Sequence, residues 1–247
     1  AGESIVLGED VTVNSKINVP AGTTTVLDLN GHVLAGAFDN NGGSALIDNA
    51  GTLTITNGTI VSLAQYPDVD WGTEGFPTYA TNTISNRGNL VIEEGTVIEN
   101  QTNVGGASYA IDNYPGATLT VNGGTIEHLG GTSMAWGIDN LTNGKGTYAE
   151  TVINGGVVKS KYIAIRQFLN GTEAQNILTV NGGTIEGTNK SIWMQEANAN
   201  ANNGALTVAA GAAIKGDVYL FVTAGSTEWP VSVSIAADAL QGESQIT

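Results

Sequence analysis

The sequence predicts an all-β chain that folds as a single right-handed parallel β-helix, with about seven turns of roughly 27 residues. Three observations favour this fold. A pattern of about 27 residues recurs through nearly the whole chain, and each copy contains short alternating segments that end at Gly or Asn. The composition adds 34 glycines with only 6% aromatic residues, which predicts many tight turns around a core of Ile, Val, Leu and Ala.

The first repeated segment alternates apolar and polar residues and then reaches a turn of Asn and Gly. Such alternation predicts a strand with one buried face. Its copies are Leu27–Leu34, Thr52–Ile60, Asn89–Val97, Thr118–Ile126, Thr151–Val158, Leu178–Ile185 and Leu206–Ala213.

A second repeated segment lies between the copies of the first. Its copies are Ala45–Asn49, Asn82–Asn86, Tyr109–Asn113, Trp136–Asn140, Ile163–Gln167 and Ile192–Glu196. Two clear strands, and a third after the Gly-Gly turn, fit within one period, which is the arrangement of a parallel β-helix. A propeller blade would need about 40 residues, and a leucine-rich repeat would include a helix.

Stacking the repeats predicts columns of identical side chains. Three inward columns are expected: Leu53, Leu90, Leu119, Leu178, Leu206; Ile55, Ile92, Val121, Ile153, Val180, Val208; and Ile47, Ile84, Ile111, Ile138, Ile165, Met194. Two residues beyond the last column, an amide ladder is expected at Asn49, Asn86, Asn113, Asn140 and Gln167. Stacked amides can hydrogen-bond to one another and to free backbone groups.

The length of the chain limits the number of domains, and its charge limits the classes of partner. The 247 residues predict one domain, with an N-terminal cap region at 1–25, regular repeats at 26–216 and C-terminal strands or a cap at 217–247. The net charge of −15 argues against nucleic acids and anionic membrane surfaces as partners. Cysteine is absent, and no apolar run is long enough to insert into a membrane.

These repeats resemble the right-handed parallel β-helix proteins of the pectin-lyase-like type. The segment Leu27–His32, read as LDLNGH, followed by copies of TLTVNGGTIE, is similar to repeat proteins of bacterial cell surfaces and phage virions. The resemblance covers roughly residues 25 to 216 and is specific for architecture, because this fold hosts lyases, hydrolases, adhesins and virion fibres alike.

An acidic column lies one residue before the amide ladder: Asp48, Ser85, Asp112, Asp139 and Arg166. In polysaccharide lyases of the resembled fold, clustered carboxylates hold calcium and an Arg or Lys acts as base, so Asp112, Asp139 and Arg166 are the residues expected to act if the chain is an enzyme. Paired carboxylates also serve glycosidases. The alternative is an outward solenoid position, as in the column of Glu127, Lys159 and Glu186, where opposite charges relieve repulsion.

The histidines and the threonine rows are two further patterns that could indicate a functional site. The isolated His32 and His128 are expected at the surface or in turns, and no Arg-x-Lys element accompanies them. The threonine rows suggest a third candidate function, an ice-binding solenoid, although valine and alanine residues interrupt the rows. The rows are Thr54, Thr120, Thr179, Thr207 and Thr59, Thr96, Thr125, Thr184.

An insertion stretches one repeat between Ile47 and Ile84, and the excess falls in Ser62–Thr81. Aromatic and acidic groups on a loop held by a rigid scaffold commonly contact sugars or proteins. The binding residues predicted there are Tyr66, Asp68, Asp70, Trp71, Glu74, Phe76 and Tyr79. The other interpretation is a loop that covers the core or packs on a neighbouring subunit.

The sequence therefore favours a non-enzymatic structural and attachment protein: a virion decoration or head-fibre module, or a bacterial surface module, located outside the cell. Its expected partners are a surface glycan or protein receptor, or other proteins of the virion or cell surface. A homotrimer is kept as a candidate assembly. No cofactor is expected, with calcium as a candidate ligand of the acidic columns. The principal alternative is a carbohydrate-active enzyme, either a polysaccharide lyase or a glycoside hydrolase.

Overall fold

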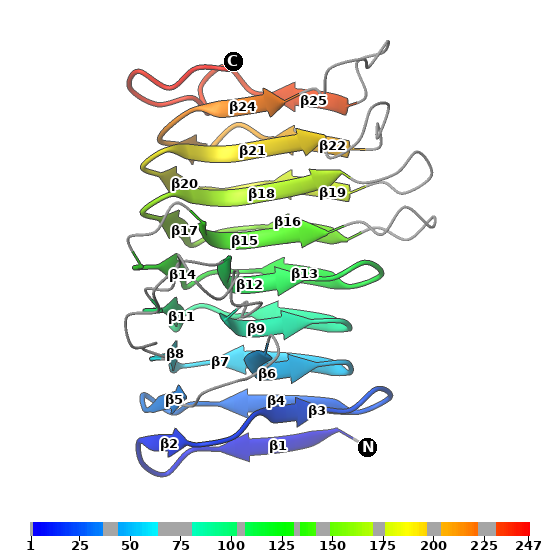
Figure 1. Ribbon diagram of the computed structural model, residues 1–247, viewed down its shortest axis with the longest axis vertical. Coiled ribbons are helices and arrows are strands. Elements are labelled where there is room, and N and C mark those ends of the chain that lie inside the picture. Colours follow the sequence, from blue (N-terminus) through cyan, green and yellow to red (C-terminus); the bar gives the residue numbers. More distant parts are fainter. Residues whose placement is uncertain are drawn as a thin grey trace, which may run out of the picture.

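In the computed structural model, parallel strands stack to form an elongated rod, with the N-terminus and the C-terminus at opposite ends (Figure 1). The structure describes residues 2–36, 44–63, 81–102, 107–130, 134–141, 149–169, 176–196, 204–221 and 231–247. These residues form strands and turns without any α-helix, so within them no helix could cross a membrane. The predicted all-β solenoid is confirmed, and it is of the right-handed type.

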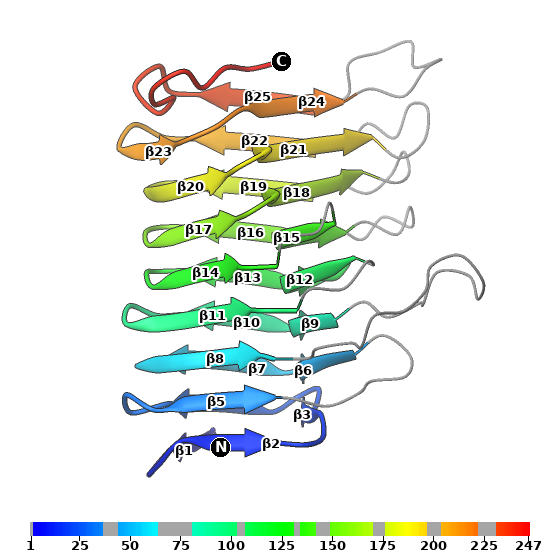
Figure 2. The same ribbon diagram turned by 60° about the vertical axis from the view of Figure 1, so that its left-hand side comes forward.

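Three parallel sheets run along the rod, and each rung before β25 contributes one strand to each sheet (Figures 1 and 2). Sheet A contains β1 (Glu3–Val6), β4 (Thr24–Asp28), β7 (Thr52–Thr56), β10 (Asn89–Ile92), β13 (Thr118–Val121), β16 (Glu150–Ile153), β19 (Asn176–Val180), β22 (Gly204–Val208) and β25 (Val231–Ile235). Sheet B contains β2 (Val11–Val13), β5 (Val33–Gly36), β8 (Gly58–Ser62), β11 (Thr96–Asn100), β14 (Thr125–His128), β17 (Val157–Ser160), β20 (Gly183–Gly187) and β23 (Ala212–Ile214).

Sheet C forms the front of Figure 1 and carries the candidate site. It contains β3 (Ile17–Val19), β6 (Ser44–Asn49), β9 (Thr81–Asn86), β12 (Ser108–Asn113), β15 (Ala135–Leu141), β18 (Ile163–Leu169), β21 (Lys190–Glu196) and β24 (Val218–Phe221). Strands from both predicted cap regions, β1–β3 and β24–β25, pair in the same sheets as the regular repeats.

The core consists of the predicted inward columns, which the strand register aligns rung by rung. Leu53 pairs with Leu90 and Leu90 with Leu119, while the adjacent column of Ile55, Ile92 and Val121 follows the same register. All six side chains are almost completely buried. The leucine column is interrupted by one polar residue, Thr151, which lies between Leu119 and Leu178.

The third column was predicted correctly except at its last member. Ile165 pairs with Ile192, whereas Met194 pairs with Gln167 and so continues the amide-ladder column. The cause is a break in alternation, because Ala164 and Ile165 both point into the core while Ile163 belongs to a separate outer cluster. The sequence pattern aligned Ile163-Ala-Ile165 with Ile192-Trp-Met194, which differs by two residues from the pairing of these strands in the structure.

The second threonine row was wrong at Thr96. Thr59 pairs with Val97, whereas Thr96 pairs with Gly58 and is fully buried, donating from Oγ1 to the carbonyl oxygen of Ile55 at 3.1 Å. A turn with different backbone angles, with Asn57 and Gly58 both at positive φ, shifts this register by one residue. Valines thus interrupt the outward threonine rows at Val91, Val97 and Val152.

Glycine is required at the Gly-Gly turn because the rungs stack closely there. Gly124, Gly156 and Gly183 have φ of +77°, +80° and +82°, in the left-handed region that other residues rarely adopt. A Cβ on Gly156 would also lie 2.5 Å from the carbonyl oxygen of Gly124 in the neighbouring rung. The repeated Asn-Gly-Gly motif is therefore a consequence of rung stacking.

Candidate functional site

The predicted amide ladder lies inside the solenoid at the corner that follows sheet C. The Nδ2 atom of Asn49 donates to Oδ1 of Asn86 at 2.8 Å, Asn86 donates to Asn113 at 2.8 Å, and Asn113 donates to Asn140 at 3.1 Å. All four side chains are fully buried. Because each amide satisfies the next, the ladder can occupy a dry position at low cost.

The amides of Asn49, Asn86 and Asn113 also bond to the backbone of sheet A. Asn49 and Asn86 donate to the carbonyl oxygens of Asn89 and Thr118 at 3.0 Å and 2.8 Å, and their Oδ1 atoms accept from backbone amides two residues later. The ladder ends at Gln167, where both side-chain amide atoms are buried without a partner. The longer side chain does not meet Asn140, whose Nδ2 is also unpaired.

A second amide ladder, missed in the sequence, runs along the exposed turn between sheets A and B. The Nδ2 atoms of Asn154 and Asn181 donate to the residue one rung below, at 3.0 Å and 2.9 Å, and Asn122 donates to the carboxylate of Glu93. The signal was present in the first Asn of each Asn-Gly-Gly motif. Exposure to water makes this ladder less important for stability than the buried one.

At the corner between sheets B and C, side chains accept hydrogen bonds from the backbone N–H groups two residues later and so cap the turn. Asn100 and His128 accept from the amides of Thr102 and Gly130 at 2.9 Å and 3.0 Å. His128 is buried, which corrects the expectation of a surface position but agrees with that of a turn. Since Nδ1 accepts, Nε2 carries the proton and donates to Ser108 Oγ at 2.7 Å, so this pair lacks a general base for the serine.

The acidic column has the predicted register along sheet C. Asp48, Ser85, Asp112, Asp139 and Arg166 are successive partners, and the column continues to Trp193 and Tyr219. Near the N-terminal end, Asp48 is paired with Lys16 and Arg87, each at 3.3 Å.

Asp139 and Arg166 form a two-pronged ion pair in the middle of this column. The Nε and Nη2 atoms of Arg166 lie 2.7 Å and 2.5 Å from the two carboxylate oxygens of Asp139, which is fully buried. The guanidinium is further covered by the rings of Trp136 and Phe168, with its carbon 4.5 Å and 4.8 Å from their centroids. Both partners are committed to each other, which leaves neither free to act as an acid or base.

Asp112 is buried without a cation directly beside it. Its Oδ2 accepts from Nδ2 of Asn82 at 3.0 Å, whereas its Oδ1 has no partner. Burial, with the negative charge of Asp139 as the second cause, raises the pKa of Asp112 to about 7. A hydrogen bond with Tyr114 and the charge of Arg166 oppose this rise.

The other acidic column is also neutralised by lysines. Glu127 and Lys159 are 2.8 Å apart, and Lys215 is 4.0 Å from Glu186. Among the described residues, no group of three or more His, Cys, Asp or Glu side chains could hold a metal ion. Four of the five carboxylates in these columns, all except Asp112, therefore form ion pairs, and calcium binding stays a prediction.

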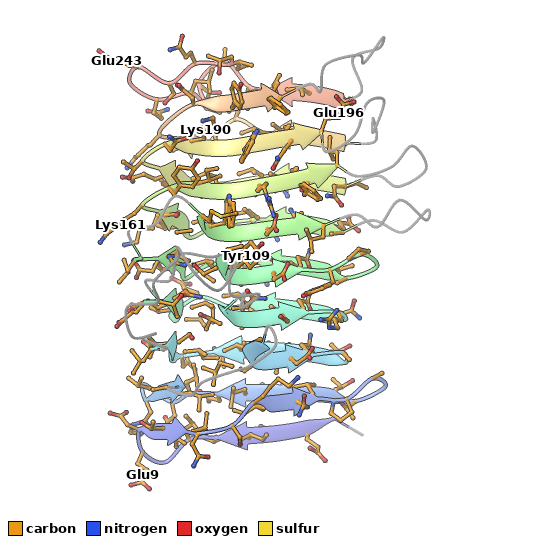
Figure 3. The ribbon with its side chains drawn as sticks, viewed as in Figure 1. Glu9, Tyr109, Lys161, Lys190, Glu196 and Glu243 are labelled. Carbon is orange, nitrogen blue, oxygen red and sulfur yellow. The ribbon has the colours of Figure 1, made fainter. Side chains whose placement is uncertain are left out.

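An aromatic surface, also not predicted from the sequence, continues the acidic column of sheet C, and a buried aromatic pair lies in a neighbouring column. Tyr109 and Trp136 are stacked with centroids 5.1 Å apart, on neighbouring strands β12 and β15. Further along, Trp193, Tyr219 and Phe221 contact one another on β21 and β24. Figure 3 shows Tyr109 and Lys190 on this face of the rod.

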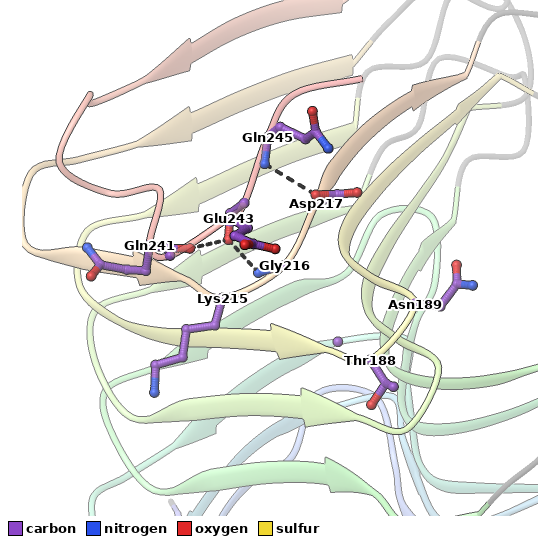
Figure 4. Close-up of a pocket in the computed structure, with 11 residues that line it drawn as sticks. Thr188, Asn189, Lys215, Gly216, Asp217, Gln241, Glu243 and Gln245 are labelled. Atoms are coloured by element: carbon purple, nitrogen blue, oxygen red, sulfur yellow. Dashed lines mark hydrogen bonds between the residues drawn. The ribbon is translucent and has the colours of Figure 1, made fainter.

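A cleft of about 630 Å³ opens between the turns near Thr188 and Lys215 and the C-terminal residues 241–245 (Figure 4). Its polar groups mainly hold the turns together. The hydroxyl of Ser244 accepts from the amide of Gly216 at 2.8 Å, and Asp217 accepts from the amide of Gln245 at 3.2 Å. These contacts attach the last segment to the rung below.

The predicted binding loop lies outside the described residues. This holds for all seven of its candidate side chains: Tyr66, Asp68, Asp70, Trp71, Glu74, Phe76 and Tyr79. Their role stays a prediction. Family models, curated proteins and solved structures provide no match to the chain, so its function has to be inferred from its own residues.

Proposed function

We propose that the chain is a non-enzymatic structural and attachment module, displayed outside the cell on a virion or a bacterial surface. The observation that carries this proposal is the state of the two central carboxylates. Asp112 is 3% exposed and Asp139 is 0% exposed, and the charge of Asp139 is already matched by Arg166. These acids contribute to the packing of sheet C.

Catalysis by this column would require a different arrangement. Glycosidases place two carboxyl groups on either side of the scissile bond, with room for the sugar and for water. A substrate cannot approach Asp139 without displacing Arg166, whose side chain is itself only 12% exposed. The ion pair thus favours the structural proposal over the lyase or hydrolase alternative.

The architecture supports a role as a spacer. Neighbouring rungs are joined by backbone hydrogen bonds in parallel sheets, and the rungs from Asn49 to Asn140 are also joined by a buried amide ladder, which makes a stiff rod. A stiff rod with outward side chains in fixed columns suits the display of a contact surface at a distance from its anchor.

Co-sedimentation tests this proposal. The labelled full chain is mixed with intact bacterial cells and with purified cell-wall material, and the bound fraction and the soluble sugar fragments are measured together. The proposal predicts saturable retention without release of fragments. Fragment release that follows protein concentration would support the enzyme alternative, and no retention on any surface would contradict the attachment role.

A further inference from the structure

Most described cationic side chains are paired with a carboxylate, as expected in a chain with a net charge of −15. The pairs are Lys16 and Arg87 with Asp48, Lys159 with Glu127, Arg166 with Asp139, and Lys215 with Glu186. Within the described part of the chain, Lys161 and Lys190 have no carboxylate within ion-pair distance. Both lie on the same side of the rod, on neighbouring rungs (Figure 3).

Lys190 is held against the aromatic surface of sheet C. Its Nζ lies 4.7 Å from the ring centroid of Tyr219 and 6.0 Å from that of Trp193. The same atom donates to Oδ1 of Asn189 at 2.6 Å, which leaves other ammonium hydrogens available. The aromatic faces thus hold a positive charge in place without neutralising it.

The rings beside Lys190 are partly open to solvent. The centroid of Trp193 is 6.5 Å from those of both Tyr219 and Phe221, and Phe221 is 38% exposed. Gln195 is the register partner of Phe221 and adds an amide next to the rings. Exposed aromatic residues beside fixed polar groups are typical of sites that bind ligands with one apolar and one polar face.

We propose that the lysine–aromatic surface formed by Lys190, Trp193, Tyr219 and Phe221 binds a saccharide that bears a carboxylate. The apolar face of a sugar ring would lie against Trp193 and Phe221, and the carboxylate would pair with Lys190. Charge complementarity selects this occupant, because a strongly acidic chain repels anions except where its ammonium groups lack an acidic partner. The inference rests on the proposed attachment function and names the surface and the ligand class.

Calorimetric titration of the full chain tests this site with two probes of equal length, a uronic-acid oligosaccharide and a neutral glucose oligosaccharide. The acidic probe should bind, and its affinity should fall as salt increases. Lys190→Gln should weaken it about threefold, as for a surface ion pair, and Trp193→Ala about tenfold, as for an interface aromatic.

Matched controls separate this surface from others. Lys159→Gln removes a lysine on sheet B that is already paired with Glu127 and should leave the affinity unchanged. Trp71→Ala tests the loop predicted from the sequence and should also have no effect on this probe. Circular dichroism spectra and melting temperatures establish that each variant is folded before it is titrated.

Several results would overturn the proposal: no binding of the acidic probe at millimolar concentration, equal binding of the neutral probe, or unchanged binding in both Lys190→Gln and Trp193→Ala. Loss of binding only in Trp71→Ala would place the site in the loop. Retention on cells without any saccharide binding would leave the attachment function intact and reject this site alone, because a protein receptor would then be the partner.

Discussion

Asn86 and Asn113 are joined by a hydrogen bond of 2.8 Å from Nδ2 of the first to Oδ1 of the second, and neither side chain is exposed to solvent. They are 27 residues apart in sequence, so the bond is a direct consequence of the repeat length. Each amide is satisfied only when the next rung supplies its partner. The ladder therefore couples the stability of neighbouring rungs.

Replacing Asn113 by Leu should lower the free energy of unfolding by about 1–3 kcal/mol, because the Asn86 amide and the carbonyl of Glu150 lose a buried partner. Chemical denaturation measures the change. The matched control is Asn154→Leu in the exposed ladder, where water replaces the lost bonds and a change within about 0.5 kcal/mol is expected. Equal costs at both positions would show that burial is not what makes the ladder important.

Gln167→Asn should stabilise the protein by about 1 kcal/mol, because it replaces a buried amide without partners by one that continues the ladder from Asn140. Gln167→Met, which copies Met194 in the next rung, should also stabilise by removing the unpaired polar atoms. A destabilisation in both variants would mean that Gln167 has partners in solution.

Asp112→Asn should stabilise the protein at pH 8 by about 2–4 kcal/mol, since one pKa unit corresponds to about 1.4 kcal/mol. The folded pKa of about 7 lies above the ordinary value of 3.8. The unfolded state therefore binds fewer protons between these values, so native stability falls as the pH rises from about 4 to 7 and then levels off. The gain should be small at pH 4. Urea unfolding of both proteins at each pH measures it.

Asp139→Asn should have the opposite effect at pH 8. It leaves the largely buried guanidinium of Arg166 without its carboxylate, which should cost about 3 kcal/mol or more. The two substitutions are chemically identical and lie one rung apart in the same column. If both changed stability in the same direction, the assignment of the ion pair would be wrong.

Protonation of His128 should destabilise the fold in acid. Burial lowers its pKa to about 4, below the ordinary 6.5, so the stability it contributes is complete above pH 6.5 and is lost as the pH falls toward 4. His128→Asn should keep the turn cap, as Asn100 does one rung earlier, and should flatten this part of the profile. An unchanged profile between pH 6.5 and 4 would contradict the assignment.

The periodic features were predictable because period and strand alternation together determine which side chains stack. The Ile84, Ile111 and Ile138 column and the register of Asp112 with Asp139 follow from the 27-residue step alone. The errors at Met194 and Thr96 arose where a break in strand alternation or an altered turn shifts the register locally. Such shifts depend on backbone angles that the repeat does not encode.

The environment of the acidic column could not be predicted from its register. An outward position in a solenoid is expected to be exposed, yet Asp112 and Asp139 are buried, and the Arg166 guanidinium that pairs with Asp139 lies over the ring of Trp136. The aromatic surface could not be predicted from the repeat because its aromatic residues occupy only a few rungs of sheet C. The strand register places Tyr109 and Trp136 in one column of sheet C and Trp193 and Tyr219 in another.

The most direct test of the non-enzymatic account is a reducing-end and unsaturated-product assay on acidic and neutral polysaccharides, with and without calcium. The native chain and Asp112→Asn are compared at equal concentration. The account predicts no product from either protein, together with the higher unfolding free energy of the variant at pH 8. Product formation by the native chain that disappears in a folded Asp112→Asn variant would contradict it and would make the buried column a catalytic site.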